Sequence, residues 1–407
     1  MRDALIRWFH GLHEHVKPGA RFAWAWPLVE GAETFLLTPG TRTTEGAHVR
    51  DPMDLKRLMM FVVYAIAPAM LAGAWSIGHT AFVAEGVASP AVADCLLRGL
   101  WHMLPIVVTS YAVGGFWEVM FCIVRKHEIN EGFLVTGLLF PLTLAPTTPL
   151  WIVALGVTFG VVIGKEVFGG TGYNLLNPAL TARAFVFFAY PAVISGARVW
   201  DVSNRWNPFT TFGPAVDGYT GATPLLAVAN APRGADPIAA IAAEGWSWSD
   251  LFLGTIPGSM GEVSAAACGV GALLLIVSGI GSWRVMAGSV LGLAAASTLL
   301  NQFAGPDALA AMALPFHYHL VMGSFAFGAV YMATDPVSAA HTNAGRLIYG
   351  FGIGCMVVLI RVLNPAYPEG VMLSILFMNV FAPLIDYVVI RRSSSARRAR
   401  LAAAPAK

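Results

Sequence analysis

The chain has 407 residues, of which 57% are hydrophobic and 12% are charged, and its formal net charge is +2. Soluble proteins carry about 25% charged residues, so this composition excludes an ordinary soluble domain, and the small net charge argues against a nucleic-acid partner. The four cysteines show no C-x-x-C spacing, which argues against a disulfide framework or a zinc site and favours buried small side chains.

Residues 1–56 form a charged extension with several aromatic side chains, as in Trp8-Phe9-His10 and again near Trp24. This pattern predicts an amphipathic helix on the membrane surface followed by an irregular cytoplasmic arm. A disordered leader is the alternative, but such leaders are poor in aromatic residues. A cleavable signal peptide is not expected, because the first long apolar run begins only near Leu58.

Ten apolar blocks follow the extension, and most approach the ~20 residues that a helix needs to cross a bilayer. Backbone polar groups cannot stay unpaired in lipid, so the blocks predict an all-α polytopic membrane protein. They form two sets of five, at about 57–78, 98–124, 132–146, 149–168 and 178–196, and at about 262–281, 284–303, 313–333, 346–364 and 369–390. The third block is short and closes with Pro-Thr-Thr-Pro, which predicts a broken or half-length helix.

Lysines and arginines alternate between successive loops, and this alternation predicts that both termini are cytoplasmic. When a repeat with an odd number of membrane spans is duplicated in tandem, the second copy has the opposite orientation in the membrane. The only internal match is weak, between Ala145-Pro146-Thr147-Thr148-Pro149 and Ala333-Thr334-Asp335-Pro336, and each string is predicted to mark a broken helix. The expected organisation is a cytoplasmic extension (1–56), a five-helix repeat (57–197), an outer loop (198–260), a second five-helix repeat (261–390) and a basic cytoplasmic tail (391–407).

The outer loop contains the string Asp217-Gly218-Tyr219-Thr220-Gly221-Ala222-Thr223-Pro224. Its glycines permit a tight turn that exposes the Thr223 hydroxyl. The Asp217 side chain either stabilises this turn by hydrogen bonding to the backbone of the turn or binds the metal of a modifying enzyme. Taken alone, the string is typical of an ordinary surface turn.

Glu118 lies inside the second block, in Val113-Gly114-Gly115-Phe116-Trp117-Glu118. An ionisable side chain at membrane depth is costly and usually faces a protein interior or a water path. The paired glycines allow a ligand or another helix to approach closely. The carboxylate is either a cation ligand or the partner of a nearby arginine.

The loop before the fifth block reads Lys165-Glu166-Val167-Phe168-Gly169-Gly170-Thr171-Gly172-Tyr173-Asn174-Leu175-Leu176-Asn177-Pro178. It lacks the G-x-G-x-x-G and G-K-[ST] patterns of nucleotide sites. Asn174 and Asn177 offer the donors and acceptors that the edge of an uncharged heterocycle needs. Asn177 is equally the expected N-cap of a helix whose first residue is Pro178.

Together these strings resemble the NqrB/RnfD family. Its members are membrane subunits of the Na⁺-translocating NADH:quinone oxidoreductase and of the related Rnf complex. The block from Lys165 to Leu180 and the string from His127 to Phe133 extend the likeness over nearly the whole chain. The resemblance implies that a flavin transferase attaches FMN to Thr223 through a phosphoester, within a motif that includes Asp217 and Gly221. It also implies a non-covalent riboflavin held near the cytoplasmic face by Asn174 and Asn177.

The resemblance further implies quinone and Na⁺ sites. Gly114 and Gly115 border the implied quinone pocket and Phe133 completes its apolar wall. Phe185 and Phe187 are further candidates for a wall against quinone or flavin, although aromatic stripes are more often packing. Glu118, Asp335 and Asp386 are the implied Na⁺ residues, since carboxylate oxygens suit a hard cation. From the sequence alone, Asp335 is as readily the cap of a helix beginning at Pro336, and Asp386 lies near the interface, where a carboxylate is cheap.

The implied protein is one member of a multi-subunit complex in the bacterial inner membrane. That complex passes electrons from NADH, for which the binding site lies on another polypeptide, to ubiquinone and exports Na⁺. The N-terminal extension favours the NqrB branch over the RnfD branch, whose complex transfers electrons between ferredoxin and NAD⁺. An inverted-repeat transporter without a redox role is the alternative of a different class.

Overall fold

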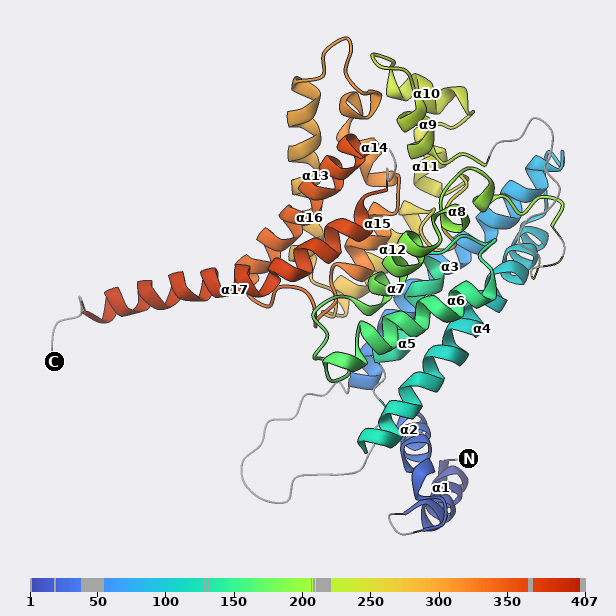
Figure 1. Ribbon diagram of the computed structural model, residues 1–407, viewed down its shortest axis with the longest axis vertical. Coiled ribbons are helices and arrows are strands. Elements are labelled where there is room, and N and C mark those ends of the chain that lie inside the picture. Colours follow the sequence, from blue (N-terminus) through green and yellow to red (C-terminus); the bar gives the residue numbers. More distant parts are fainter. Residues whose placement is uncertain are drawn as a thin grey trace.

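The computed structural model describes residues 2–17, 20–37, 55–126, 129, 132–205, 207, 209, 221–364 and 369–402, and these residues form helices and irregular segments without a β-strand (Figure 1). The predicted all-α polytopic fold is therefore confirmed. Within the described residues, six helical segments are long and apolar enough to cross a membrane. They are α3 (Leu55–Ala84), α4 (Val92–Arg125), α6 (Leu150–Thr158) with its continuation η2 (Phe159–Ile163) and η3 (Glu166–Phe168), α13 (Trp283–Gln302), α16 (Asn343–Leu363) and α17 (Val371–Ala402).

Three further apolar helices are short: α5 (Gly132–Leu142), α7 (Pro178–Ala189) and α12 (Ala265–Val277). The half-length helix predicted for the third block is confirmed by α5. The prediction of one helix over 178–196 is wrong, because α7 ends at Tyr190 and Pro191 begins the separate turn α8 (Pro191–Ile194). A proline lacks the N–H that a continuing helix would need and clashes with the preceding turn.

The block predicted at 313–333 is also broken. It consists of η5 (Ala310–Ala313), α14 (Phe316–Val321), α15 (Phe325–Phe327) and the π-helical η6 (Gly328–Met332). Gly323 and Ser324 interrupt it with φ values of +60° and +64°. The freed carbonyls of Met322 and Gly323 accept hydrogen bonds from Arg361 of α16 at 2.7 and 3.0 Å, which satisfies backbone groups that lipid could not.

The break after α5 is closed by a segment from the other half of the chain. The amide of Met260 donates to the carbonyl of Leu144 at 3.1 Å, and the amide of Gly261 donates to Leu142 at 2.8 Å. A Cβ on Gly261 would lie 2.8 Å from the Leu142 side chain, so only glycine permits this approach. The two halves of the chain are therefore joined by hydrogen bonds between the segment after α5 and the segment before α12. The inverted relation between the two halves stays a prediction.

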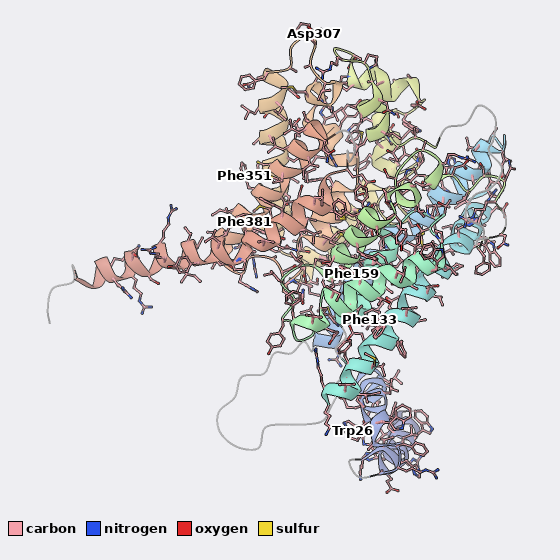
Figure 2. The ribbon with its side chains drawn as sticks, in the orientation of Figure 1. Trp26, Phe133, Phe159, Asp307, Phe351 and Phe381 are labelled. Carbon is pink, nitrogen blue, oxygen red and sulfur yellow. The ribbon has the colours of Figure 1, made fainter. Side chains whose placement is uncertain are left out.

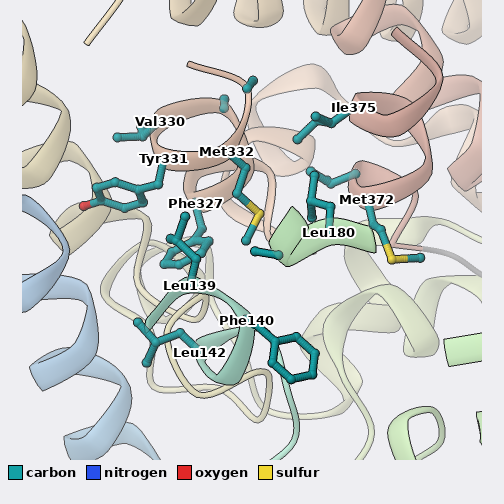
Figure 3. Close-up of a cluster of buried hydrophobic side chains, with 14 of the residues drawn as sticks. Leu139, Phe140, Leu142, Leu180, Phe327, Val330, Tyr331, Met332, Met372 and Ile375 are labelled. Atoms are coloured by element: carbon teal, nitrogen blue, oxygen red, sulfur yellow. The ribbon is translucent and has the colours of Figure 1, made fainter. Parts of the chain in front are cut away.

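Glycines allow α13 and α16 to pack backbone against backbone. A Cβ on Gly292 would lie 2.0 Å from the Phe351 carbonyl oxygen, and one on Gly354 would lie 2.1 Å from that of Ser289. Each helix has two glycines four residues apart, Gly288 and Gly292 on α13 and Gly350 and Gly354 on α16. Small residues at this spacing permit close contact between membrane helices, which are held together by packing and not by the hydrophobic effect. The core lies between α5, α7, η6 and α17, where Leu139, Leu180, Met332 and Met372 are almost fully buried (Figure 3).

The short helices α9 (Pro224–Asn230), α10 (Pro237–Ala243) and α11 (Trp248–Leu253) lie at the opposite end of the molecule from α1 (Arg2–Val16) and α2 (Trp26–Leu36) (Figure 1). Asp307 and Trp26 mark these two ends (Figure 2). The predicted amphipathic helix in the extension corresponds to α1, and the His13 Nε2 of α1 lies 2.7 Å from a Glu33 carboxylate oxygen of α2. The helix α17 extends to Ala402 and includes the basic residues from Arg391 to Arg400.

Candidate functional site

A cavity of about 220 Å³ lies among segments of both halves of the chain. Its walls are mostly apolar, and its polar side chains come from α5, from the loop between η2 and α7, and from η6 and the turn after it. A mostly apolar pocket with a few convergent polar groups is the usual form of a cofactor site. The polar and charged lining residues are Thr136, Lys165, Thr171, Asn174, Asn177, Tyr331, Thr334 and Asp335.

Asn174 and Asn177 are therefore brought together in one cavity, as the sequence predicts. Asn177 is also the predicted N-cap, since its side-chain oxygen accepts from the amides of Ala179 at 3.0 Å and Leu180 at 3.2 Å. Its side-chain nitrogen donates to the carbonyl of Met332 at 3.5 Å, which links α7 to η6. The side-chain nitrogen of Asn174 donates to Leu176 at 2.9 Å. These bonds fix both amides at the edge of the cavity.

Asp335 lines the same cavity but does not cap a helix. It accepts from the Ser338 hydroxyl at 2.5 Å and from the amides of Val337 and Ser338 at 3.4 and 3.3 Å. These residues form a turn, and the next helix, α16, begins only at Asn343, so the predicted helix at Pro336 is wrong. Removal from water raises the pKa of the Asp335 carboxyl, while the hydrogen bonds from Ser338 and Val337 oppose that rise.

Glu118 is buried in α4 and its partner is a lysine, where the sequence suggested an arginine. The carboxylate contacts the ammonium of Lys165, and both side chains are about 4% exposed. Lys165 also lies 3.5 Å from Glu166, which Arg125 holds at 3.1 Å. Two carboxylates and two cations thus form one charge-balanced cluster beside the cavity.

Gly114 and Phe133 contact each other, and neither lines the cavity. A Cβ on Gly114 would lie 2.4 Å from the Phe133 ring, whereas one on Gly115 would lie 3.8 Å from it. Phe185 stacks on Phe159 with ring centroids 4.5 Å apart, and Phe187 packs edge-on against Phe188. Neither Phe185 nor Phe187 lines the cavity. Both contacts are packing between aromatic rings, which is the ordinary role of aromatic stripes.

Asp386 lies apart from the cavity and organises the start of α16. It accepts from the amides of His341 at 2.6 Å and Thr342 at 3.0 Å, and from the Thr342 hydroxyl at 2.5 Å. Thr342 in turn caps α16 by accepting from the amide of Gly345 at 3.0 Å. These hydrogen bonds give the carboxylate a structural role at the start of the helix.

Thr223 does not line this cavity and lies at the start of α9. Its half-buried hydroxyl accepts from the amide of Leu226 at 3.3 Å and lines a small cavity of about 40 Å³. Gly221 packs against the main chain, because a Cβ there would lie 2.3 Å from the Ala197 carbonyl oxygen. Asp217 lies outside the described residues.

An ionic network lies beside the cavity at Thr223, and the sequence did not predict it. Arg183 of α7 reaches Glu262 at 3.2 Å and Glu369 at 2.6 Å, and Glu262 also accepts from the Ser324 hydroxyl at 2.5 Å. The sequence does show that Arg183 and Glu262 each lie near the edge of a predicted apolar block. Because these residues are 79 positions apart, only the fold reveals that they pair.

Comparison with known proteins agrees with these observations. A model of the NQR2, RnfD, RnfE family matches residues 42–395. The chain is 46% identical over 411 residues to the NqrB subunit of the Na(+)-translocating NADH-quinone reductase of Pseudomonas paraeruginosa, with 96% of this chain and 97% of that relative covered. It is 47% identical over 412 residues to the protein of the same name from Stutzerimonas stutzeri, with the same coverage. The chain therefore belongs to the NQR2, RnfD, RnfE family.

Proposed function

We propose that this chain is the NqrB subunit of a bacterial Na⁺-translocating NADH:quinone reductase, an inner-membrane complex. The relatives with that name match it over almost its full length, and six described segments can span a membrane. NADH binds elsewhere in the complex, because the sequence of this chain holds no dinucleotide motif. This chain carries electrons to quinone, and its electron transfer is coupled to Na⁺ export.

One observation carries the cofactor proposal: Thr223 lines one cavity, and Asn174 and Asn177 line a separate one. We assign covalent FMN to Thr223 and riboflavin to the cavity. The site at Thr223 suits a phosphoester, because an esterified oxygen keeps a lone pair and can still accept from Leu226. The covalent bond gives the tethered group a high local concentration near its reaction partners.

The cavity suits a flavin ring for a second reason. Its apolar walls exclude water from the flat faces of a ring, while the two asparagines, Thr171 and Lys165 supply donors and acceptors at the edge. A bound flavin supplies the electron chemistry, and the protein sets its position and surrounding polarity. Gly114, Gly115 and Phe133 border the adjoining quinone site in this proposal, and Glu118, Asp335 and Asp386 serve the Na⁺ path.

Mass spectrometry of the Thr223 peptide tests the proposal directly. The chain is co-expressed with a flavin transferase, and the peptide should gain the mass of FMN less water, with flavin fluorescence in a denaturing gel. Thr223→Val should lose both signals. Thr220→Val, which changes the other threonine of the same motif, should retain them. An unmodified wild-type peptide under these conditions would refute covalent attachment.

The same purified proteins distinguish the proposal from its two alternatives, an Rnf-type subunit and a transporter without a redox role. A complex of the proposed type reduces quinone with NADH and is stimulated by Na⁺, whereas an Rnf-type complex depends on ferredoxin. A transporter without a redox role would move its substrate normally in the Thr223→Val variant.

A further inference from the structure

An open groove of about 630 Å³ lies against the first turns of α4 and belongs to neither cavity described above. Its lining residues are Phe82, Asp94, Leu97, Arg98, Trp101 and His102. Phe82 comes from α3, and the other five come from α4. Leu97 and Trp101 are 67% and 57% exposed, so the groove faces outward. Tryptophan is enriched at the level of lipid headgroups, and this end of α4 is therefore expected to lie at the membrane surface.

His102 is the polar group at the buried side of the groove. Its side chain is 1% exposed, and neither ring nitrogen makes a hydrogen bond of normal geometry to a described residue. The main chain of Arg205 lies near the ring but could satisfy only one of its two nitrogens. A buried polar group without a partner costs free energy, and ionisable side chains within membrane spans usually mark functional sites. His102 therefore indicates a ligand that brings a hydrogen-bonding group into the groove.

Asp94, Arg98 and His102 follow one another along one face of α4. They are four residues apart, so each lies about 6 Å further along the helix axis than the one before. Asp94 is exposed at the start of the helix, whereas Arg98 is 5% exposed and His102 is more deeply buried. The groove thus presents a carboxylate, then a guanidinium, then an imidazole, from the membrane surface inward.

Contacts within the protein fix the position of Arg98. Its two terminal nitrogens donate to the Glu85 carboxylate at 2.7 and 2.5 Å, and one of them also donates to the carbonyl of Val202 at 3.2 Å. The guanidinium carbon lies 4.7 Å from the centroid of the Phe82 ring. Glu85 does not line the groove. The guanidinium is therefore held in place before a ligand arrives, which lowers the entropy cost of binding.

The charges of the groove favour a ligand with a cation at one end and negative oxygens next to it. The guanidiniums of Arg98 and Arg205 both act electrostatically on His102, so a phosphate or carbonyl oxygen is favoured in the inner part of the groove. The exposed carboxylate of Asp94 favours a cation at the mouth. The apolar surfaces of Leu97 and Trp101 remain for hydrocarbon.

We propose that this groove binds a phospholipid with a primary ammonium headgroup, of the phosphatidylethanolamine type. Asp94 faces the ammonium, Arg98 faces the phosphate, and a ring N–H of His102 donates to an ester carbonyl. These three lipid groups follow one another in the same order as the three side chains. Phosphatidylglycerol has the phosphate and the esters but no cation for Asp94, so it fits the groove less well. The proposal does not depend on the redox chemistry proposed above.

The test uses the full-length chain, purified from bacterial membranes with its partner subunits and stripped of lipid by detergent exchange. Dioleoyl-phosphatidylethanolamine is titrated into it, bound lipid is counted by native mass spectrometry, and thermal unfolding is recorded. Two further lipids separate the contacts. Dioleoyl-phosphatidylglycerol lacks the ammonium, and a diether phosphatidylethanolamine lacks only the ester carbonyls.

The wild type should bind the diester phosphatidylethanolamine about fivefold more tightly than either comparison lipid, the usual effect of one hydrogen bond or ion pair. His102→Leu should lose the preference for diester over diether but keep the preference for the ammonium. Asp94→Asn should show the reverse pattern. Asp307→Asn removes an exposed carboxylate outside the groove and should keep both preferences.

Equal binding of the diester and diether lipids by the wild type would overturn the inference, and this measurement needs no variant that must fold. Equal binding of phosphatidylethanolamine and phosphatidylglycerol would do the same. Without lipid, His102→Leu should unfold no earlier than the wild type, because it removes a buried polar group that lacks a partner. Earlier unfolding would show that His102 serves the fold and not a lipid. None of these measurements uses quinone reduction, so their failure would leave the proposed function intact.

Discussion

At the scale of single residues, the two glycines of V-G-G-F-W-E have different surroundings although they are neighbours in sequence. Gly114 faces Phe133 and Val157, and an added Cβ would lie 2.4 and 2.9 Å from their side chains. Gly115 has only a distant contact of 3.8 Å with Phe133. The sequence assigned both to a pocket border, whereas the structure makes Gly114 the position where the absence of a side chain matters.

Gly114→Ala should therefore displace Phe133 and lower stability by about 1–3 kcal/mol, the usual range for overpacking. The same displacement should raise the KM for quinone if Phe133 walls that site. Thermal unfolding in detergent and quinone titration measure the two effects. Gly115→Ala is the matched control and should change neither quantity, and equal effects in both variants would contradict this account of the packing.

At the scale of elements, breaks and caps decide where helices end. The sequence predicted the short third block from its prolines and the cap at Asn177 from the Asn-Pro pair, and both are confirmed. It did not predict the break at Gly323 and Ser324, because residues 321–333 are mostly apolar and contain no proline. The break is stabilised by Arg361 from another helix, which no local pattern could reveal.

The helix α11 provides a pH-dependent test of capping. Hydrogen bonds from the side chain and the amide of Ser247 hold the pKa of Asp250 below its usual value. A folded pKa below the unfolded one stabilises the helix above the unfolded pKa, and this contribution is lost as pH falls through the folded pKa. Protection of the α11 amides against hydrogen exchange should therefore fall on acidification.

Ser247→Ala should cost about 0.5–2 kcal/mol of local stability at neutral pH, since it removes the N-cap. It should also move the loss of α11 protection to a higher pH, because Asp250 then lacks its main partner. The helix α9, which is capped by the hydroxyl of Thr223 and not by a carboxylate, is the internal reference, and a parallel loss of protection in α9 would show that acid acts through global unfolding instead.

At the scale of the whole molecule, ionic contacts join the two halves of the chain. Arg183 of the first half pairs with Glu262 and Glu369 of the second half, and both carboxylates line the cavity at Thr223. Asn177, on the same helix, reaches Met332 at the other cavity. The helix α7 thus contacts both candidate cofactor sites, and its position depends on both halves.

Arg183→Met should lower stability by about 3–5 kcal/mol, because it leaves the buried Glu262 carboxylate without its counter-ion. Replacing Glu262 by Gln in the same chain should restore part of that loss. Thermal unfolding of the purified complex measures both. Arg198→Met removes the same charge at an exposed position and should have little effect, so comparable losses in the two variants would contradict the role given to Arg183.

The sequence by itself determined the membrane class, the helical fold, the half-length third block, the cap at Asn177 and the motif that carries Thr223. These depend on hydropathy, on proline and on side-chain contacts within a few residues, all of which are local. The tertiary structure decided that Glu118 pairs with Lys165, 47 residues away, and that Arg183 reaches Glu369, 186 residues away. Charges at membrane depth must find counter-ions wherever the packed helices bring them, so their partners follow from the fold and not from their neighbours in sequence.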